Sequence, residues 1–157
     1  WQDKGLETRI VRFFNTVGPR QQGAYGMVVP RFISAALTNE EITIYGDGNQ
    51  TRCFGHVDDI IEALIQVSNS EKTIGTVVNI GNKDEISIND LAAKILEITG
   101  SKSQIVYVSY ADAYKTGFED MERRVPNIDR IKELTGWEPK RDLETIIRDV
   151  AMHLQNQ

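Results

Sequence analysis

The sequence predicts an α/β domain in which short strands alternate with helices. Two kinds of segment take turns along the chain: runs of β-branched and aromatic residues, and stretches whose apolar residues recur at helical spacing. Such alternation is typical of α/β architectures. The length of 157 residues corresponds to one domain, and no repeat, low-complexity segment or linker divides it. We therefore expect a single domain over residues 1–157.

Short apolar runs provide the predicted strands, which cover residues 8–14, 42–45, 77–80 and 105–108. We expect the first of them to be buried, because it is rich in β-branched and aromatic residues. The turn Gly46-Asp47-Gly48-Asn49 closes the second strand, and residues 50–57 resume an extended chain. Residues 15–26 are predicted to form a polar loop, and residues 110–127 are polar with little periodicity.

Helical periodicity predicts five helices, near residues 29–37, 57–67, 87–100, 128–135 and 143–154. The third has the clearest start, because Ser87 with Asp90 resembles a capping box. Gly100 and Gly136 are natural C-terminal stops for the third and fourth helices.

Composition limits the classes of function. Eighteen Lys and Arg against 23 Asp and Glu give a net charge of −5, which disfavours nonspecific nucleic-acid binding. With one cysteine, Cys53, expected to be buried, and two histidines, the chain offers no disulfide pair and no zinc cluster, so we assign no metal site. No apolar run approaches the roughly 20 residues that span a bilayer, and no signal peptide opens the chain. We expect a soluble, cytoplasmic domain with no membrane partner.

The chain shows neither a catalytic triad nor a dinucleotide fingerprint. His153 is predicted to be a surface residue, and His56, at a strand-to-helix junction, to be structural or to support a site. The glycine turn at residues 46–48 leads into extended chain and not into a helix, as a dinucleotide loop requires. No Tyr is followed four residues later by Lys. We therefore assign no catalytic residue within the chain.

Polar side chains lie at strand ends, where open α/β sheets bind their ligands. Asn15 directly follows the first strand, Arg52 lies in the extended run after the glycine turn, and Arg123 and Arg124 lie in the later polar stretch. Guanidinium and amide groups donate hydrogen bonds to phosphate oxygens. Each residue also has a plainer interpretation: Asn15 as a loop cap and the arginines as solvated surface charges.

Several motifs in register resemble the extended short-chain dehydrogenase/reductase family, which includes nucleotide-sugar epimerases, dehydratases and decarboxylases. These motifs occupy residues 9–21, 42–59, 79–82, 117–127 and 134–139. In that family a Rossmann half holds NAD and carries the glycine fingerprint and a Tyr/Lys pair. This chain resembles the second half only, so we expect NAD to be bound mainly by an N-terminal portion that is absent here. The opening at Trp1, with no initiator methionine, fits that expectation.

The resemblance implies roles for individual residues. Asn15 and Arg52 correspond to residues that contact the substrate diphosphate. Thr43 and Tyr45, which can offer backbone groups and a ring face, correspond to residues that flank the base. Asp120 corresponds to a residue that closes over the nucleotide together with a nearby arginine.

That closing arginine is uncertain in position, because Gly117-Phe118-Glu119-Asp120 replaces the usual Arg-Pro-Gly-Asp; Arg123 and Arg124 are the two candidates. Met27, with Val28, stands near the substrate where relatives often place Asn or Arg. Phe13 corresponds to a position near the nicotinamide.

The resemblance implies an enzyme that transiently oxidises a UDP- or dTDP-sugar with NAD. UDP-glucose 4-epimerisation is the leading expectation, and UDP-glucuronate decarboxylation and dTDP-glucose 4,6-dehydration are alternatives. A non-catalytic, nucleotide-binding regulatory relative and a fragment with no intact site are the other classes. We expect the 157 residues alone to be inactive and the full-length protein to be a homodimer, as relatives often are.

Overall fold

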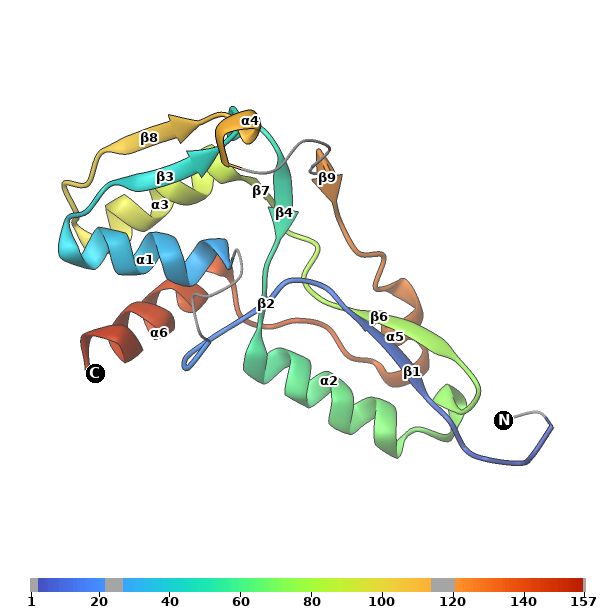
Figure 1. The fold of residues 1–157 in the computed structure, drawn as a ribbon. Coiled ribbons are helices and arrows are strands. Elements are labelled where there is room, and N and C mark those ends of the chain that lie inside the picture. Colours follow the sequence, from blue (N-terminus) through green and yellow to red (C-terminus); the bar gives the residue numbers. More distant parts are fainter. Residues whose placement is uncertain (1–2, 22–26, 114–120, 157) are drawn as a thin grey trace.

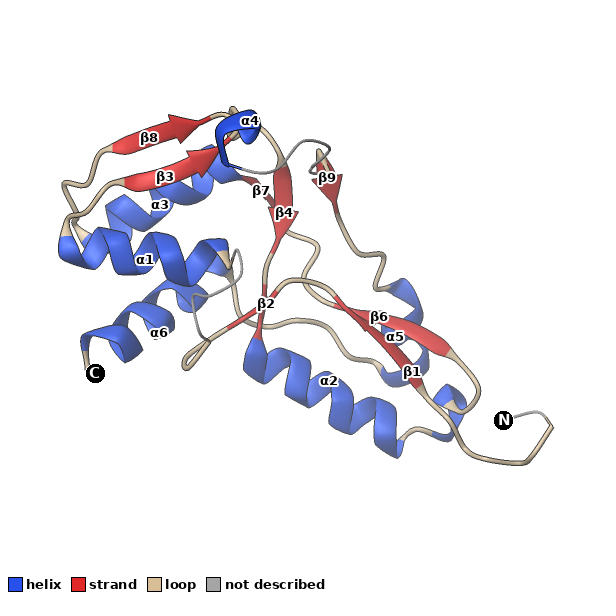
Figure 2. Ribbon diagram, viewed as in Figure 1, coloured by secondary structure: helices blue, strands red, loops and turns tan. Residues whose placement is uncertain are grey.

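The computed structural model describes residues 3–21, 27–113 and 121–156 (Figure 1). The first half contains β1 (Ile10–Phe13), β2 (Thr16–Val17), α1 (Val28–Thr38), β3 (Ile42–Tyr45), β4 (Thr51–Cys53), β5 (Gly55–His56), α2 (Val57–Asn69) and the short 3-10 helix η1 (Glu71–Thr73). The second half contains β6 (Val77–Ile80), β7 (Glu85–Ser87), α3 (Ile88–Thr99), β8 (Ile105–Val108), α4 (Tyr110–Ala113), β9 (Arg123–Arg124), α5 (Asp129–Thr135) and α6 (Leu143–Gln155). The α/β class predicted from the sequence is confirmed (Figure 2).

The strands pair in four small groups. Within the described residues, β1 pairs with β6, β2 with β5 and β3 with β8, all parallel. The fourth group is mixed: β4 lies in the middle, antiparallel to β7 on one side and parallel to β9 on the other. Every pairing joins segments that are distant in sequence, so tertiary packing holds these strands in place.

Two apolar clusters form the core. In the larger one α1, α3 and α6 pack against one another and against β3, with Phe32, Ile44, Leu91 and Ile147 almost fully buried. The smaller one gathers α2, α5 and β6 around Trp137, which is 2% exposed. Figure 1 shows β4 and β2 running between the two groups of helices, so the segments that join the clusters also carry the candidate site residues.

The helices begin and end close to their predicted positions. Ser87 caps α3, where its hydroxyl oxygen accepts from the backbone N–H of Asp90 at 3.0 Å. Gly100 and Gly136 end α3 and α5 with φ of 64° and 78°, a left-handed conformation that glycine adopts without steric cost. These local signals explain why sequence periodicity was sufficient to find the five longer helices.

Two expectations about other segments need correction. The strand expected to be buried is β1, yet Ile10 and Phe13 are 53% and 50% exposed. Val11 of this strand is half-buried and packs against the smaller apolar cluster. The polar stretch 110–127, which has little periodicity, contains α4 and β9. Strand β9 was invisible to periodicity because it is two residues long and exists through pairing with the distant β4.

Candidate functional site

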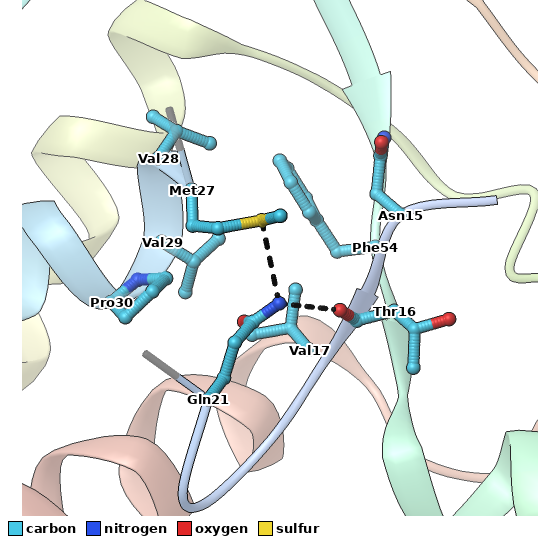
Figure 3. A pocket seen from close by; sticks show the side chains of 9 residues that line it. All are labelled: Asn15, Thr16, Val17, Gln21, Met27, Val28, Val29, Pro30 and Phe54. Atoms are coloured by element: carbon cyan, nitrogen blue, oxygen red, sulfur yellow. Dashed lines mark hydrogen bonds between the residues drawn. The ribbon is translucent and has the colours of Figure 1, made fainter. Parts of the chain in front are cut away.

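A cavity of about 170 Å³ lies between the chain that follows β1 and the start of α1 (Figure 3). Its lining residues are Asn15, Thr16, Val17, Gln21, Met27, Val28, Val29, Pro30 and Phe54. Three predicted substrate-binding residues, Asn15, Met27 and Val28, therefore come together. In Figure 3 the Phe54 ring lies between Asn15 and Met27. The cavity is an apolar chamber with a few polar groups, an arrangement common in ligand pockets.

Asn15 is positioned by β4 and β5. Its side-chain nitrogen donates to the Cys53 carbonyl at 3.0 Å, and its backbone carbonyl accepts from the Gly55 N–H at 2.9 Å. The loop-capping interpretation of Asn15 thus holds for its amide nitrogen. These two contacts fix the side chain at the edge of the cavity, which it also lines.

Gln21 is a cavity residue that sequence reasoning missed. Its side-chain nitrogen donates to the Thr16 carbonyl at 3.0 Å and to the Met27 sulfur at 3.5 Å. The Thr16 carbonyl can only accept, so it determines which end of the amide is the nitrogen. Gln21 lies two residues after Pro19 in the loop, but a single sequence gives no signal that its side chain contacts Met27.

Arg52 and Arg124 lie on one face of the β7–β4–β9 sheet. Arg52 pairs in register with Arg124, and directly paired residues of neighbouring strands point to the same side. The Arg124 guanidinium lies 5.1 Å from the centre of the Phe14 ring, next to Asn15 in the chain. Arg52 donates to the carbonyls of Thr51 and Met121 at 2.8 and 2.7 Å. Arg52 and Arg124 do not line the 170 Å³ cavity.

Arg123 lies on the opposite face of the same sheet. Its guanidinium forms a two-point ion pair with Glu85, with Nε–Oε1 and Nη2–Oε2 distances of 2.9 Å. The Thr51 hydroxyl also donates to Glu85. The hydrogen bonds from Arg123 and then from Thr51 hold the pKa of Glu85 below its ordinary value. The two arginines that the sequence could not separate therefore face different surroundings.

Thr43 and Tyr45 lie on β3, outside the cavity, and Arg31 of α1 connects them to it. The Arg31 Nη2 atom donates to the Thr43 carbonyl at 3.0 Å, and its guanidinium lies 4.8 Å from the centre of the Tyr45 ring. Arg31 lines a second cavity of about 400 Å³, which shares Gln21 and Pro30 with the first. The start of α1 thus lies between the residues predicted for the base and the cavity that contains Asn15.

The remaining predicted residues are less informative. Phe13 is half-exposed at the carboxyl end of β1 and does not line the cavity. Asp120 lies outside the described residues.

Among the described residues, no three His, Cys, Asp or Glu side chains are arranged to hold a metal ion. None of the described helices combines the length and apolar character needed to cross a bilayer.

His56 and Cys53 have structural surroundings. The Nδ1 atom of His56, which is 1% exposed, accepts from the Asp58 N–H at 3.1 Å and so caps α2. Its Nε2 atom lies 3.2 Å from the Asp149 carboxylate of α6. Cys53 is also 1% exposed, as the sequence predicted, and burial raises the pKa of its thiol to about 11. Neither side chain lines the cavity.

Comparison with known sequences identifies the family. The family described as GDP-mannose 4,6 dehydratase matches residues 1–150. The chain belongs to the extended short-chain dehydrogenases/reductases, the NAD-dependent epimerase/dehydratase family. The resemblance inferred from the motifs is thereby confirmed.

Two curated relatives of this epimerase/dehydratase chain are decarboxylases. The chain is 44% identical over 137 residues to the UDP-N-acetyl-alpha-D-glucosaminuronate decarboxylase of Bacillus cytotoxicus, covering 87% of this chain and 42% of that protein. It is 41% identical over 143 residues to UDP-glucuronic acid decarboxylase 1 of Xenopus tropicalis, covering 91% and 32%. The chain thus spans about a third to two-fifths of the curated relatives that it matches.

A solved structure matches most of the fold. The UDP-glucuronic acid 4-epimerase of Bacillus cereus, in complex with UDP-glucuronic acid and NAD, superposes with a TM-score of 0.82 at 26% identity. The match covers 94% of this chain and 45% of that one. The arrangement of elements in this epimerase/dehydratase chain is therefore that of half of a known NAD-dependent enzyme.

Proposed function

We propose that this chain is the nucleotide-sugar-binding portion of an NAD-dependent enzyme that acts on a UDP-uronic acid. The two curated relatives and the solved structure are named for UDP-sugars that carry a carboxylate. Decarboxylation is the leading reaction, since both curated relatives are decarboxylases; 4-epimerisation, favoured by the solved structure, is the second candidate. The sequence-based preference for a UDP-glucose 4-epimerase is not confirmed by the curated relatives and stays a prediction behind the uronic-acid substrate. The use of dTDP-sugars and the dimeric state stay predictions.

The observation that carries the proposal is the side-by-side placement of Arg52 and Arg124. Neighbouring strands lie about 4.8 Å apart, and like charges directly opposite each other on a sheet destabilise it. A diphosphate between two guanidinium groups would remove that repulsion and accept hydrogen bonds from both. The Arg124 guanidinium lies 5.1 Å from the centre of the Phe14 ring, and the next residue, Asn15, lines the cavity. The proposed diphosphate site therefore adjoins the proposed sugar cavity.

NAD does not fit the described residues. A dinucleotide site requires a glycine-rich turn between a strand and a helix. The turn at Gly46 and Gly48 instead leads into β4. The Asn89 side chain occupies the space beside Gly48, since a Cβ at this glycine would lie 2.0 Å from it. We propose that NAD is bound mainly by polypeptide outside these 157 residues, with Phe13 as a contact at the end of β1. In this arrangement the chain contributes substrate binding and orientation, which convert binding energy into a reactive geometry.

Binding of UDP tests the proposal directly. Arg52→Ala and Arg124→Ala each remove a charged donor to the diphosphate, and hydrogen bonds to charged groups contribute about 1.5–3 kcal/mol. We expect each variant to bind UDP roughly 10- to 100-fold more weakly than the parent chain in calorimetric titrations.

Arg148→Ala is the matched control. Arg148 pairs with Glu144 on the exposed side of α6, and its removal changes the net charge by the same amount. An equal loss of affinity in this control, or unchanged affinity in both test variants, would contradict the diphosphate assignment.

A further inference from the structure

We propose that Glu85 is a positioning residue that determines which arginine of β9 faces the ligand. This inference rests on the proposed function, because its effect is exerted through the diphosphate contact of Arg124. Glu85 lies on β7, two strands away from β9, and β4 lies between them. It is not among the residues that line the cavity.

The sequence of strand β9 does not decide which of its two side chains faces which side of the sheet. It consists of Arg123 and Arg124 only, so either arginine can take either side of the sheet. Because side chains alternate along a strand, a shift of register by one residue exchanges the two faces. The β4–β9 ladder pairs Thr51 with Arg123 and Arg52 with Arg124, and next to it the Thr51 N–H donates to the Glu122 carbonyl at 2.8 Å. Backbone donors and acceptors repeat at every residue of a strand, so we infer that side-chain contacts distinguish the two registers.

Glu85 selects the register from the face of the sheet opposite Arg52 and Arg124. Thr51 of β4 and Arg123 of β9 are register partners, and both donate to the Glu85 carboxylate. The Arg123–Glu85 pair uses both carboxylate oxygens, which is the geometrically most specific form of this contact. With Arg123 held by Glu85, alternation places Arg124 on the near face, where it stacks on Phe14 and is paired with Arg52.

The ion pair between Arg123 and Glu85 can select the register of β9 while contributing little to the free energy of unfolding of the chain. The side chains of Arg123 and Glu85 are 68% and 28% exposed, and exposed ion pairs stabilise proteins only weakly. Removing Glu85 should therefore leave the fold intact while releasing β9 from its register. The consequence would appear in ligand affinity, because Arg124 would no longer be held beside Arg52.

The test is a double-mutant cycle measured by UDP titration of the 157-residue chain. We expect Glu85→Ala to weaken UDP binding roughly 3- to 10-fold, a typical coupling for residues that act through a contact. In the Arg124→Ala background, we expect Glu85→Ala to have no further effect, because the residue that it positions is gone. The charge-swapped variant Glu85→Arg/Arg123→Glu should restore most of the affinity, since it rebuilds the pair with opposite polarity.

Controls separate this proposal from its alternatives. Glu138→Ala removes another exposed carboxylate, which pairs with Lys132, and should leave UDP affinity unchanged. Glu85→Gln keeps the shape and the Thr51 hydrogen bond, and should give an intermediate loss if Glu85→Ala unfolds. Unchanged affinity in Glu85→Ala, or a loss that persists in the Arg124→Ala background, would overturn the positioning role. Failure of the parent chain to bind UDP would instead overturn the proposed function.

Discussion

At the scale of single residues, Cys53 shows how surroundings decide chemistry. Cys53 is a buried residue of β4 and pairs in register with Glu85 of β7. Burial, and then the negative charges of Glu85 and Asp84, raise the pKa of the thiol to about 11. Because the thiolate is the reactive form, this cysteine is an inert core residue and not a nucleophile.

We predict that Cys53 reacts slowly with iodoacetamide in the native chain. A pKa raised from 9.0 to about 11 lowers the thiolate fraction at pH 8 by a factor of about 100, and burial slows access further. Alkylation followed by mass spectrometry should show slow modification in buffer and rapid modification in urea. Equal rates in the two conditions would contradict the burial.

The same shift makes stability depend on alkaline pH. The folded pKa lies above the unfolded one, so the contribution of the neutral thiol is present below about pH 9 and is lost as the pH rises toward 11. The urea midpoint of the parent chain should therefore fall more steeply between pH 8 and 10 than that of Cys53→Ala, which has no thiol to titrate.

At the scale of secondary-structure elements, the helices depend on local signals and the short strands do not. Ser87, Gly100 and Gly136 can be identified as helix boundaries from the sequence, because a cap acts within one turn of its own helix. Strand β9 could not be found in this way, because its two residues become a strand only beside β4. The choice between Arg123 and Arg124 depended on that pairing and so stayed open at the sequence level.

The start of α6 provides a prediction at this scale. The Asp142 carboxylate accepts from the Thr145 N–H at 2.8 Å and from its hydroxyl at 2.7 Å, which lowers the pKa of Asp142 below 3.8. Asp142→Ala should destabilise the chain by about 1 kcal/mol at neutral pH, the usual cost of losing an N-cap.

Acid should reduce this difference in stability between Asp142→Ala and the parent chain. The folded pKa of Asp142 lies below the unfolded one, so its contribution is present above about pH 4 and is lost as the pH falls through the folded pKa. Thermal unfolding at pH 7 and pH 3 should show the gap between Asp142→Ala and the parent shrinking, whereas Asp142→Ser, with a neutral cap, should keep its stability relative to Asp142→Ala at both values. A gap that stays constant would contradict the cap assignment.

At the scale of the whole molecule, buried polar contacts connect α2 to the segment between α5 and α6. The Asp59 carboxylate of α2, 1% exposed, accepts from the backbone N–H groups of Lys140 and Arg141 at 2.9 Å and pairs with the Arg141 guanidinium. The Trp137 ring nitrogen donates to the Asp59 carbonyl at 3.1 Å. The segment between α5 and α6 is therefore held against α2, which follows directly from the strands that carry the site.

The proposed function also makes a prediction for the full-length protein. With NAD, it should convert UDP-glucuronic acid to a UDP-pentose with release of carbon dioxide, and the 157-residue chain alone should not, because it lacks the Tyr/Lys pair. Chromatography of the nucleotide sugars would identify the product. Formation of UDP-galacturonic acid instead would favour 4-epimerisation, and turnover by the isolated chain would contradict the assignment of catalysis to another portion.

The amino-acid sequence was sufficient to predict the fold class, the five longer helices, the boundaries at Ser87, Gly100 and Gly136, and the family. Each of these depends on local periodicity or on motifs that can be recognised along the chain. Only the packed chain shows that Ile10 and Phe13 of β1 are exposed, that Arg124 and not Arg123 lies beside Arg52, and that Gln21, Arg31 and Glu85 contact Thr16, Thr43 and Arg123. These outcomes depend on strand pairing and side-chain contacts between segments that are distant in sequence, and no local pattern encodes such contacts.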